Sequence, residues 1–219
     1  YLELDLGDLK GAEQITLFLR GWIYPTDTSW NVSLSQNPDL DAPRMPSIWV
    51  VDENDQWVEA IPFMGFPGGK TKTITVDLSN AFLRDGDYRV RVVTSGEISW
   101  DTAFFTADEK PTTLRELDCP LAGAELRFGG FSERRPSRPN APEVYDFATR
   151  TKAPRWPPMG GSFTRYGDVT EIVRDADDRM AVLGSGDELE LRFAAESSEP
   201  PAGWTRDFIL HCVGWDKDA

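Results

Sequence analysis

The glycine-rich stretch 65–71 (GFPGGKT) holds the residue types of a phosphate-binding loop. That loop follows the pattern G-x-x-x-x-G-K-[ST] and opens a helix whose N-terminus faces the phosphates. With Gly69 and Lys70 in place, the first glycine would fall where Met64 stands. Residues 71–78 alternate polar and apolar side chains, which predicts a strand and not a helix. We therefore interpret the stretch as a Pro-Gly-Gly turn that leads into a strand, with Lys70 as a solvated charge.

Candidates for metal chemistry or nucleophilic chemistry are few. His211 is the only histidine and lies in an apolar run, so we expect a core or interface residue. The sequence contains neither H-E-x-x-H nor G-x-S-x-G. Asp216 and Asp218 form the D-x-D opening of a calcium loop whose later ligands would follow Ala219, so calcium is the only cofactor that the sequence suggests. Asp and Glu are abundant, and a carboxylate pair for glycoside hydrolysis has no marked position.

Tryptophans are the remaining candidates for binding, and the chain has eight of them. In β-sandwich modules, exposed aromatic rings stack on sugars or anchor a protein partner. Most of these tryptophans are expected in the core. Trp57, which lies beside polar residues in a hairpin, and Trp156, which lies in a Pro-rich segment, are the two expected at the surface.

The formal charge of −14 argues against nucleic acid and anionic membrane as partners, because phosphate contacts need clustered Lys and Arg. No apolar run is long enough to span a membrane. Residues 127–155 differ from the rest, with seven basic side chains against three acidic ones. This basic segment is expected to lie on the acidic body, and docking of an acidic partner is the alternative. The candidates for partner contact are Arg134, Arg135, Arg138 and Arg155.

The elements that must position these residues are strands. Alternating or apolar runs at 2–6, 15–22, 30–34, 48–51, 57–60, 71–78, 88–93 and 98–106 are separated by turns. This pattern predicts an all-β fold whose first domain, residues 1–108, is an antiparallel β-sandwich, immunoglobulin-like in its general plan.

Residues 109–219 are predicted to form a second β-rich unit, with strands at 124–128, 180–183, 188–193 and 208–213. Within it, the Pro-rich segment 132–161 has little periodicity and is expected to wrap over the unit or to be mobile. Cys119 and Cys212 allow one disulfide, although a buried free thiol is equally consistent with the apolar strand around Cys212. The two cysteines therefore do not indicate whether the compartment is oxidising or reducing.

The two ends of the chain share an order of sequence features. Leu2-Glu3-Leu4, a polar connection and the strand 15–22 are matched by Leu189-Glu190-Leu191, a polar connection and residues 208–215. The final octets align without a gap, and three positions are identical (Leu17 with Leu210, Gly21 with Gly214, Trp22 with Trp215). Two related β units would explain this similarity, and common β-sheet composition would explain it equally well.

Four phrases are more specific than composition: GWIYPTDTS at 21–29, residues 62–73, FTRYGDV at 163–169 and GWDKDA at 214–219. Together they resemble an uncharacterised C-terminal region of large bacterial proteins that also carry FG-GAP/VCBS propeller repeats, ASPIC/UnbV segments or tetratricopeptide repeats. The resemblance spreads over most of the chain and implies an accessory module, often exported, of a multidomain protein. It brings no catalytic residues, and the propeller repeats with their calcium loops are absent from this sequence. It also implies that the chain is a piece of a longer protein.

These observations favour a non-catalytic β-sandwich accessory module that mediates protein–protein assembly within a larger exported protein or complex. Its partners would be other subunits, or other domains of the same parent chain, in the extracellular space or the periplasm. A carbohydrate-binding module that uses surface tryptophans is one alternative. A hydrolase with an unlocated carboxylate pair is the other.

Overall fold

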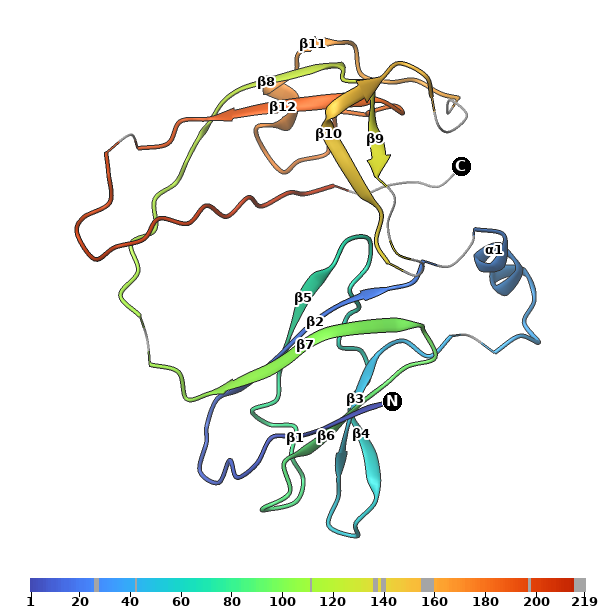
Figure 1. Ribbon diagram of the computed structural model, residues 1–219, viewed down its shortest axis with the longest axis vertical. Coiled ribbons are helices and arrows are strands. Elements are labelled where there is room, and N and C mark those ends of the chain that lie inside the picture. The colour runs from blue at the N-terminus through green and yellow to red at the C-terminus, as the bar shows by residue number, and fades with distance from the viewer. Residues whose placement is uncertain are drawn as a thin grey trace. The chain divides into compact units, whose positions relative to one another are not determined.

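The computed structural model describes residues 1–25, 28–41, 43–110, 112–135, 138, 141–154, 160–196 and 198–214, without the side chains of residues 28 and 30. The chain divides into two compact units, residues 1–112 with 136–144, and residues 113–135 with 145–219. The fold is all-β, as predicted, with antiparallel strands and two short helices (Figure 1). No helix within the described ranges is long and apolar enough to cross a membrane.

The first unit is a sandwich of two antiparallel sheets. One sheet has the order β1-β6-β3-β4 and the other β5-β2-β7. Its elements are β1 (Leu2–Asp5), β2 (Ile15–Ile23), α1 (Thr28–Gln36), β3 (Ser47–Val51), β4 (Trp57–Ile61), β5 (Lys72–Asp77), β6 (Arg89–Val93) and β7 (Ile98–Ala107).

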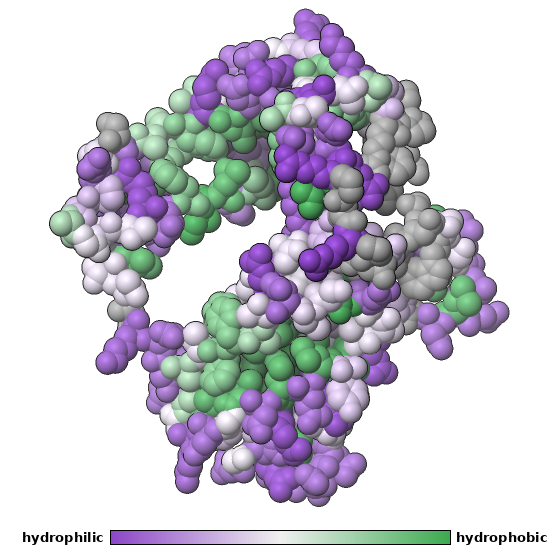
Figure 2. Space-filling model, in the orientation of Figure 1, coloured by the Kyte–Doolittle hydropathy of each residue, from purple (hydrophilic) through white to green (hydrophobic). Residues whose placement is uncertain are grey.

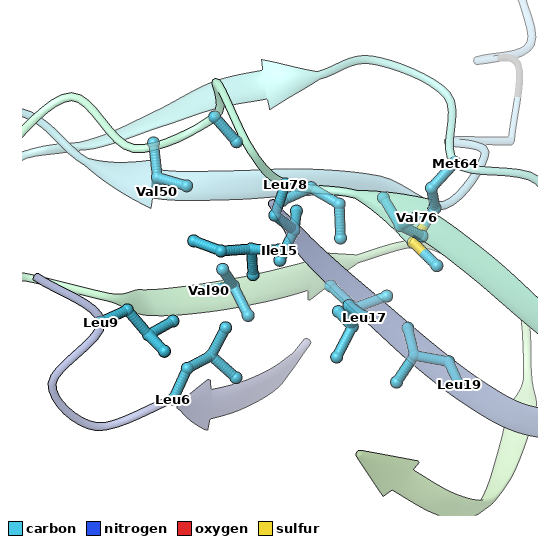
Figure 3. Close-up of a cluster of buried hydrophobic side chains, with 13 residues drawn as sticks. Leu6, Leu9, Ile15, Leu17, Leu19, Val50, Met64, Val76, Leu78 and Val90 are labelled. Carbon is cyan, nitrogen blue, oxygen red and sulfur yellow. The ribbon is translucent and has the colours of Figure 1, made fainter. Parts of the chain in front are cut away.

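The core of the first unit lies between these two sheets. Side chains from both layers point toward one another in Figure 3, among them Leu17 and Val76 from one sheet and Val50 and Val90 from the other. Leu17, Val50 and Val90 are fully buried. Burying an aliphatic side chain of this size stabilises a fold by roughly 1.5–3 kcal/mol. The alternation that predicted these strands is therefore the pattern that fills the core.

The second unit has a smaller core. A three-stranded sheet of order β11-β8-β12 and a hairpin of β9 and β10 make up its strands. The elements are β8 (Leu121–Phe128), β9 (Phe131–Arg135), β10 (Val144–Thr151), β11 (Gly167–Asp168), α2 (Thr170–Val173) and β12 (Asp187–Phe193). Ala124, Leu126 and Val169 are its buried apolar residues, with Leu189 and Leu191 packed against them.

The strand predictions at residues 30–34 and 180–183 were wrong. Residues 30–34 lie in the helix α1, where the Ser33 hydroxyl donates to the Ser29 carbonyl at 2.8 Å. Residues 180–183 are not a strand, although Val182 exchanges hydrogen bonds with Thr164 at 3.0 and 2.8 Å. The Pro-rich segment 132–161 contains most of the β9–β10 hairpin in spite of its weak periodicity. A short alternating run fits a helix as well as a strand, so the sequence pattern alone could not distinguish the two at residues 30–34.

Candidate interaction surfaces

Trp57 lies on the outer face of the four-stranded sheet and is half-buried there. The guanidinium of Arg91 lies over its ring, with the Arg91 Cζ 3.9 Å from the ring centroid. The Arg91 Cζ also lies 4.3 Å from the ring centroid of Tyr1. Arg89 is near as well, with its Cζ 5.6 Å from the Trp57 ring centroid. We call this cluster of Tyr1, Trp57, Arg89 and Arg91 the Trp57 stack.

Cross-strand register explains how the Trp57 stack is built. Arg91 on β6 lies opposite Glu3 on β1 and opposite Trp49 on β3. The Arg91 Nε donates to the Glu3 carboxylate at 2.8 Å, which fixes one edge of the guanidinium while its faces contact the aromatic rings. Arg89 is held in the same way by Asp87, at 2.5 Å, and this hydrogen bond lowers the pKa of the Asp87 carboxyl. Each arginine is therefore positioned by a carboxylate beside it.

The Trp57 stack changes what Trp57 can bind. A sugar ring stacks on the free face of an aromatic side chain. One face of Trp57 is already covered by Arg91, so the geometry does not favour the carbohydrate-binding alternative at this residue. The stack instead contributes cation–π contacts of about 0.5–1 kcal/mol each to the sheet.

A pocket of about 280 Å³ opens between β1 and β7, the edge strands of the two sheets of the first unit. It is lined by Leu4, Asp5, Leu6, Leu17 and residues 103–105. Figure 2 shows apolar side chains gathered between β7 and β1 on this side of the unit. Asp5 is its one carboxylate, and glycoside hydrolysis needs two. This pocket therefore does not provide the pair that the hydrolase alternative requires.

The stretch 62–73 behaves as a turn and a strand, as predicted. The Trp22 indole donates to the Gly69 carbonyl at 2.8 Å, and the amide of Ile23 donates to the Pro67 carbonyl at 3.0 Å. These bonds hold the turn against β2, and the chain then enters β5, an edge strand. Only Met64 of the apolar residues before the turn enters the core, because Phe63 and Phe66 are exposed.

Three of the four arginines predicted to contact a partner lie within the described residues. Arg134 and Arg135 end β9, and the Arg135 guanidinium pairs with the Asp146 carboxylate of β10 at 2.8 Å. This hydrogen bond lowers the pKa of Asp146 and raises that of Arg135. Arg138 is exposed. Arg155 and Trp156 lie outside the described residues.

The predicted metal ligands, the two cysteines and His211 have different outcomes in the structure. Asp216 and Asp218 lie outside the described residues. Within the described part of the chain, no group of three or more His, Cys, Asp or Glu side chains is arranged to hold a metal ion. Cys119 and Cys212 are both free, so the structure has no disulfide between them. His211 is exposed, so of the two expected places, core or interface, the core is excluded.

Residues 208–214 (FILHCVG), which we call the C-terminal segment, form the largest departure from expectation. The predicted strand has no strand partner among the described residues, and Figure 1 draws the segment in dark red as an extended trace. Phe208 is 71%, Ile209 96% and Val213 71% exposed. A run with this composition is normally buried on at least one face. The strand prediction at 208–213 was therefore wrong for the described structure, and no feature of the sequence indicated the exposure of these residues.

Sequence reasoning also missed two features of the first unit. Arg91, the centre of the Trp57 stack, carried no signal except its place in an alternating strand. Phe18 and Phe104 stack on the outer face of the three-stranded sheet, with ring centroids 4.7 Å apart. Both pairings join residues that are far apart in the sequence, so only the strand register reveals them.

No protein-family model matches the chain, and neither a curated protein nor a solved structure shows a significant similarity to it.

Proposed function

We propose that the chain is a non-catalytic β-sandwich accessory module that mediates protein–protein assembly. The exposure of the C-terminal segment carries this proposal. Its apolar side chains lie in solvent on both faces of an extended backbone, with Ile209 96% exposed. Folded proteins rarely leave contiguous apolar surface of this kind uncovered unless it binds a partner. Among the described residues this extended segment pairs with no strand, so its backbone N–H and C=O groups can pair with another chain.

The arrangement of the first unit supports the same proposal. Its outer sheet face is occupied by the Trp57 stack, in which each arginine already has a carboxylate partner. A sandwich of four and three antiparallel strands is the general plan of immunoglobulin-like modules, which serve many proteins as connecting or binding domains. The resemblance noted in the sequence leads us to propose further that this module belongs to a larger exported protein or complex, in the extracellular space or the periplasm.

Site-specific photo-cross-linking tests the proposal. A benzoylphenylalanine placed at position 209 should give a discrete adduct with another protein in cells that produce the parent protein. Position 114 is the matched control, because Leu114 is also apolar and 76% exposed but lies outside the C-terminal segment. Adducts that form equally from both positions, or from neither, would contradict the proposal.

A further inference from the structure

The C-terminal segment is the sequence counterpart of β2. The two align without a gap, with Leu210 at the position of Leu17 and Gly214 at the position of Gly21. Sequence identity at so few positions is weak by itself. The structure adds an independent comparison, because each of these stretches follows a Leu-Glu-Leu strand whose side chains are placed in the same way.

In the first unit, Leu2 and Leu4 of β1 pack against the core. Glu3 lies on the opposite face and forms an ion pair with Arg91 of the adjacent strand, at 2.8 Å. β1 is the edge strand of its sheet. The motif therefore uses two leucines for the core and one glutamate for the outer face.

In the second unit, Leu189 and Leu191 of β12 also pack against the core. Glu190 forms an ion pair with Arg127 of the adjacent strand β8, at 3.1 Å. β12 is again an edge strand. The similarity thus extends from residue types to the face that each side chain occupies, which favours two related units over shared composition.

β2 and the C-terminal segment differ in their burial and in their neighbouring strands. β2 is the central strand of its sheet, between β5 and β7, and Leu17 is fully buried. Leu210, at the same position in the C-terminal segment, is 59% exposed. What differs is the presence of neighbouring strands, because among the described residues nothing pairs with the segment.

The surroundings of Gly21 indicate which side chain a strand beside Gly214 would carry. A Cβ atom on Gly21 would lie 2.6 Å from the ring of Trp100 and 2.8 Å from the Ser99 carbonyl, both on β7. Glycine is needed there because an aromatic side chain of the adjacent strand occupies the space. At Gly214, apart from its chain neighbours, no atom of the described residues lies within 4 Å of the equivalent position.

We propose that the C-terminal segment pairs with a β-strand of a separate polypeptide, which would lie beside it as β7 lies beside β2, and that this strand places a bulky aromatic side chain against Gly214. The inference rests on the proposed assembly function and names the partner that the segment accepts. Main-chain hydrogen bonds would supply affinity, and the aromatic side chain would set the register. The chain carries a net charge of −14, so two copies repel each other, which favours a different polypeptide over a second copy.

The register of β2 and β7 supplies a probe. Leu19 lies opposite Ala103, and Gly21 lies opposite Trp100. If the C-terminal segment accepts a strand in the same register, Cys212 will lie opposite the residue at the position of Ala103. Directly opposite residues of antiparallel strands have Cβ atoms about 4.5–5.5 Å apart, close enough for disulfide formation after a small adjustment.

The test uses the full chain with Cys119→Ser and synthetic peptides of sequence 98–107 in a glutathione redox buffer. Peptides carry a single cysteine at the position of 102, 103 or 104. We expect Cys212 to form about tenfold more mixed disulfide with the 103 peptide, because neighbouring positions point to the other face of the strand. Replacing the peptide tryptophan by alanine, or Ile209→Lys in the protein, should remove this preference.

Equal disulfide yields for the three cysteine positions would overturn the inference, as would a Cys212–Cys212 adduct between two copies of the chain in place of the peptide adduct. If the register preference is missing while the photo-adduct at position 209 persists, strand addition is wrong and the assembly function stands. If the photo-adduct is missing as well, both fail.

Discussion

The guanidinium of Arg91 lies over the indole of Trp57, 3.9 Å from the ring centroid, although their strands β6 and β4 are separated by β3. The Arg91 Nε donates to the Glu3 carboxylate, and the Arg91 Cζ also lies 4.3 Å from the ring centroid of Tyr1. This contact ties three strands of one sheet together through a single side chain. The contact also covers one face of Trp57, which the sequence analysis proposed as a binding residue.

A double-mutant cycle should measure the Arg91–Trp57 contact directly. Replacing Arg91 by Met and Trp57 by Leu, singly and together, is expected to give a coupling energy of about 0.5–1 kcal/mol in the unfolding free energy of the first unit. Hydrogen exchange of buried β3 and β6 amides in the full chain provides that free energy. The matched control is Arg44 with Trp49, where the Cζ lies 5.9 Å from the ring centroid and the coupling should be smaller. Equal coupling in the two pairs would contradict the assignment of a specific stack.

Gly21→Ala should destabilise the first unit by about 1–3 kcal/mol, because the added methyl group would overlap Trp100 and the Ser99 carbonyl. The protection of β2 amides against hydrogen exchange reports this loss. Gly214→Ala is the matched control and should leave the unfolding free energy of the isolated chain unchanged, since nothing lies within 4 Å of the new Cβ. A loss of stability from Gly214→Ala of the same size as that from Gly21→Ala would show that the segment is already packed.

Leu17→Ala and Leu210→Ala remove leucines that occupy aligned positions in the sequence but differ in burial. Leu17 is fully buried in the core of the first unit, so its truncation should cost about 2–5 kcal/mol. Leu210 is 59% exposed, so its truncation should change the unfolding free energy by less than about 0.5 kcal/mol. Urea denaturation of the full chain, with exchange protection resolved by unit, distinguishes the two effects. Similar costs at the two positions would mean that the segment is buried in solution.

The Asp52 turn predicts a pH dependence. The Asp52 carboxylate accepts hydrogen bonds from the amides of Gln56 at 2.8 Å and Asn54 at 2.9 Å, and these bonds hold the pKa of the carboxyl below its usual value. A depressed pKa in the folded state means that the stabilisation is complete above the unfolded pKa and is lost as the pH falls through the folded pKa.

Asp52→Asn should therefore lower the midpoint of thermal unfolding at pH 7. The difference from the unsubstituted chain should shrink as the pH falls through and below the ordinary range of an aspartate, near pH 4. Glu53→Gln in the same turn is the matched control, because among the described residues the Glu53 carboxylate accepts no hydrogen bond that holds the turn. A constant difference between pH 7 and pH 3 for Asp52→Asn would refute the electrostatic explanation.

The sequence by itself determined the class of fold and the position of most strands. A period of two in β-branched and apolar residues is a local property, and it predicted β2, β3, β4, β5 and β6 because each buries one face in the same core. It also excluded the phosphate-binding loop at Gly69, since a strand and not a helix follows the turn. Local alternation failed where a run was short, as at residues 30–34, which form part of α1.

Only the tertiary structure decided which residues meet and which strand is covered. Arg91 and Trp57 lie on strands whose pairing is non-local, so no spacing in the sequence could place one over the other. β2 and the C-terminal segment share the same local signal, yet Leu17 is buried and Leu210 is exposed. Strand propensity resides in the residues, whereas burial depends on neighbouring strands that arrive from elsewhere. For that physical reason the sequence could predict a strand at 208–213, and only the structure could show that it still lacks a partner among the described residues.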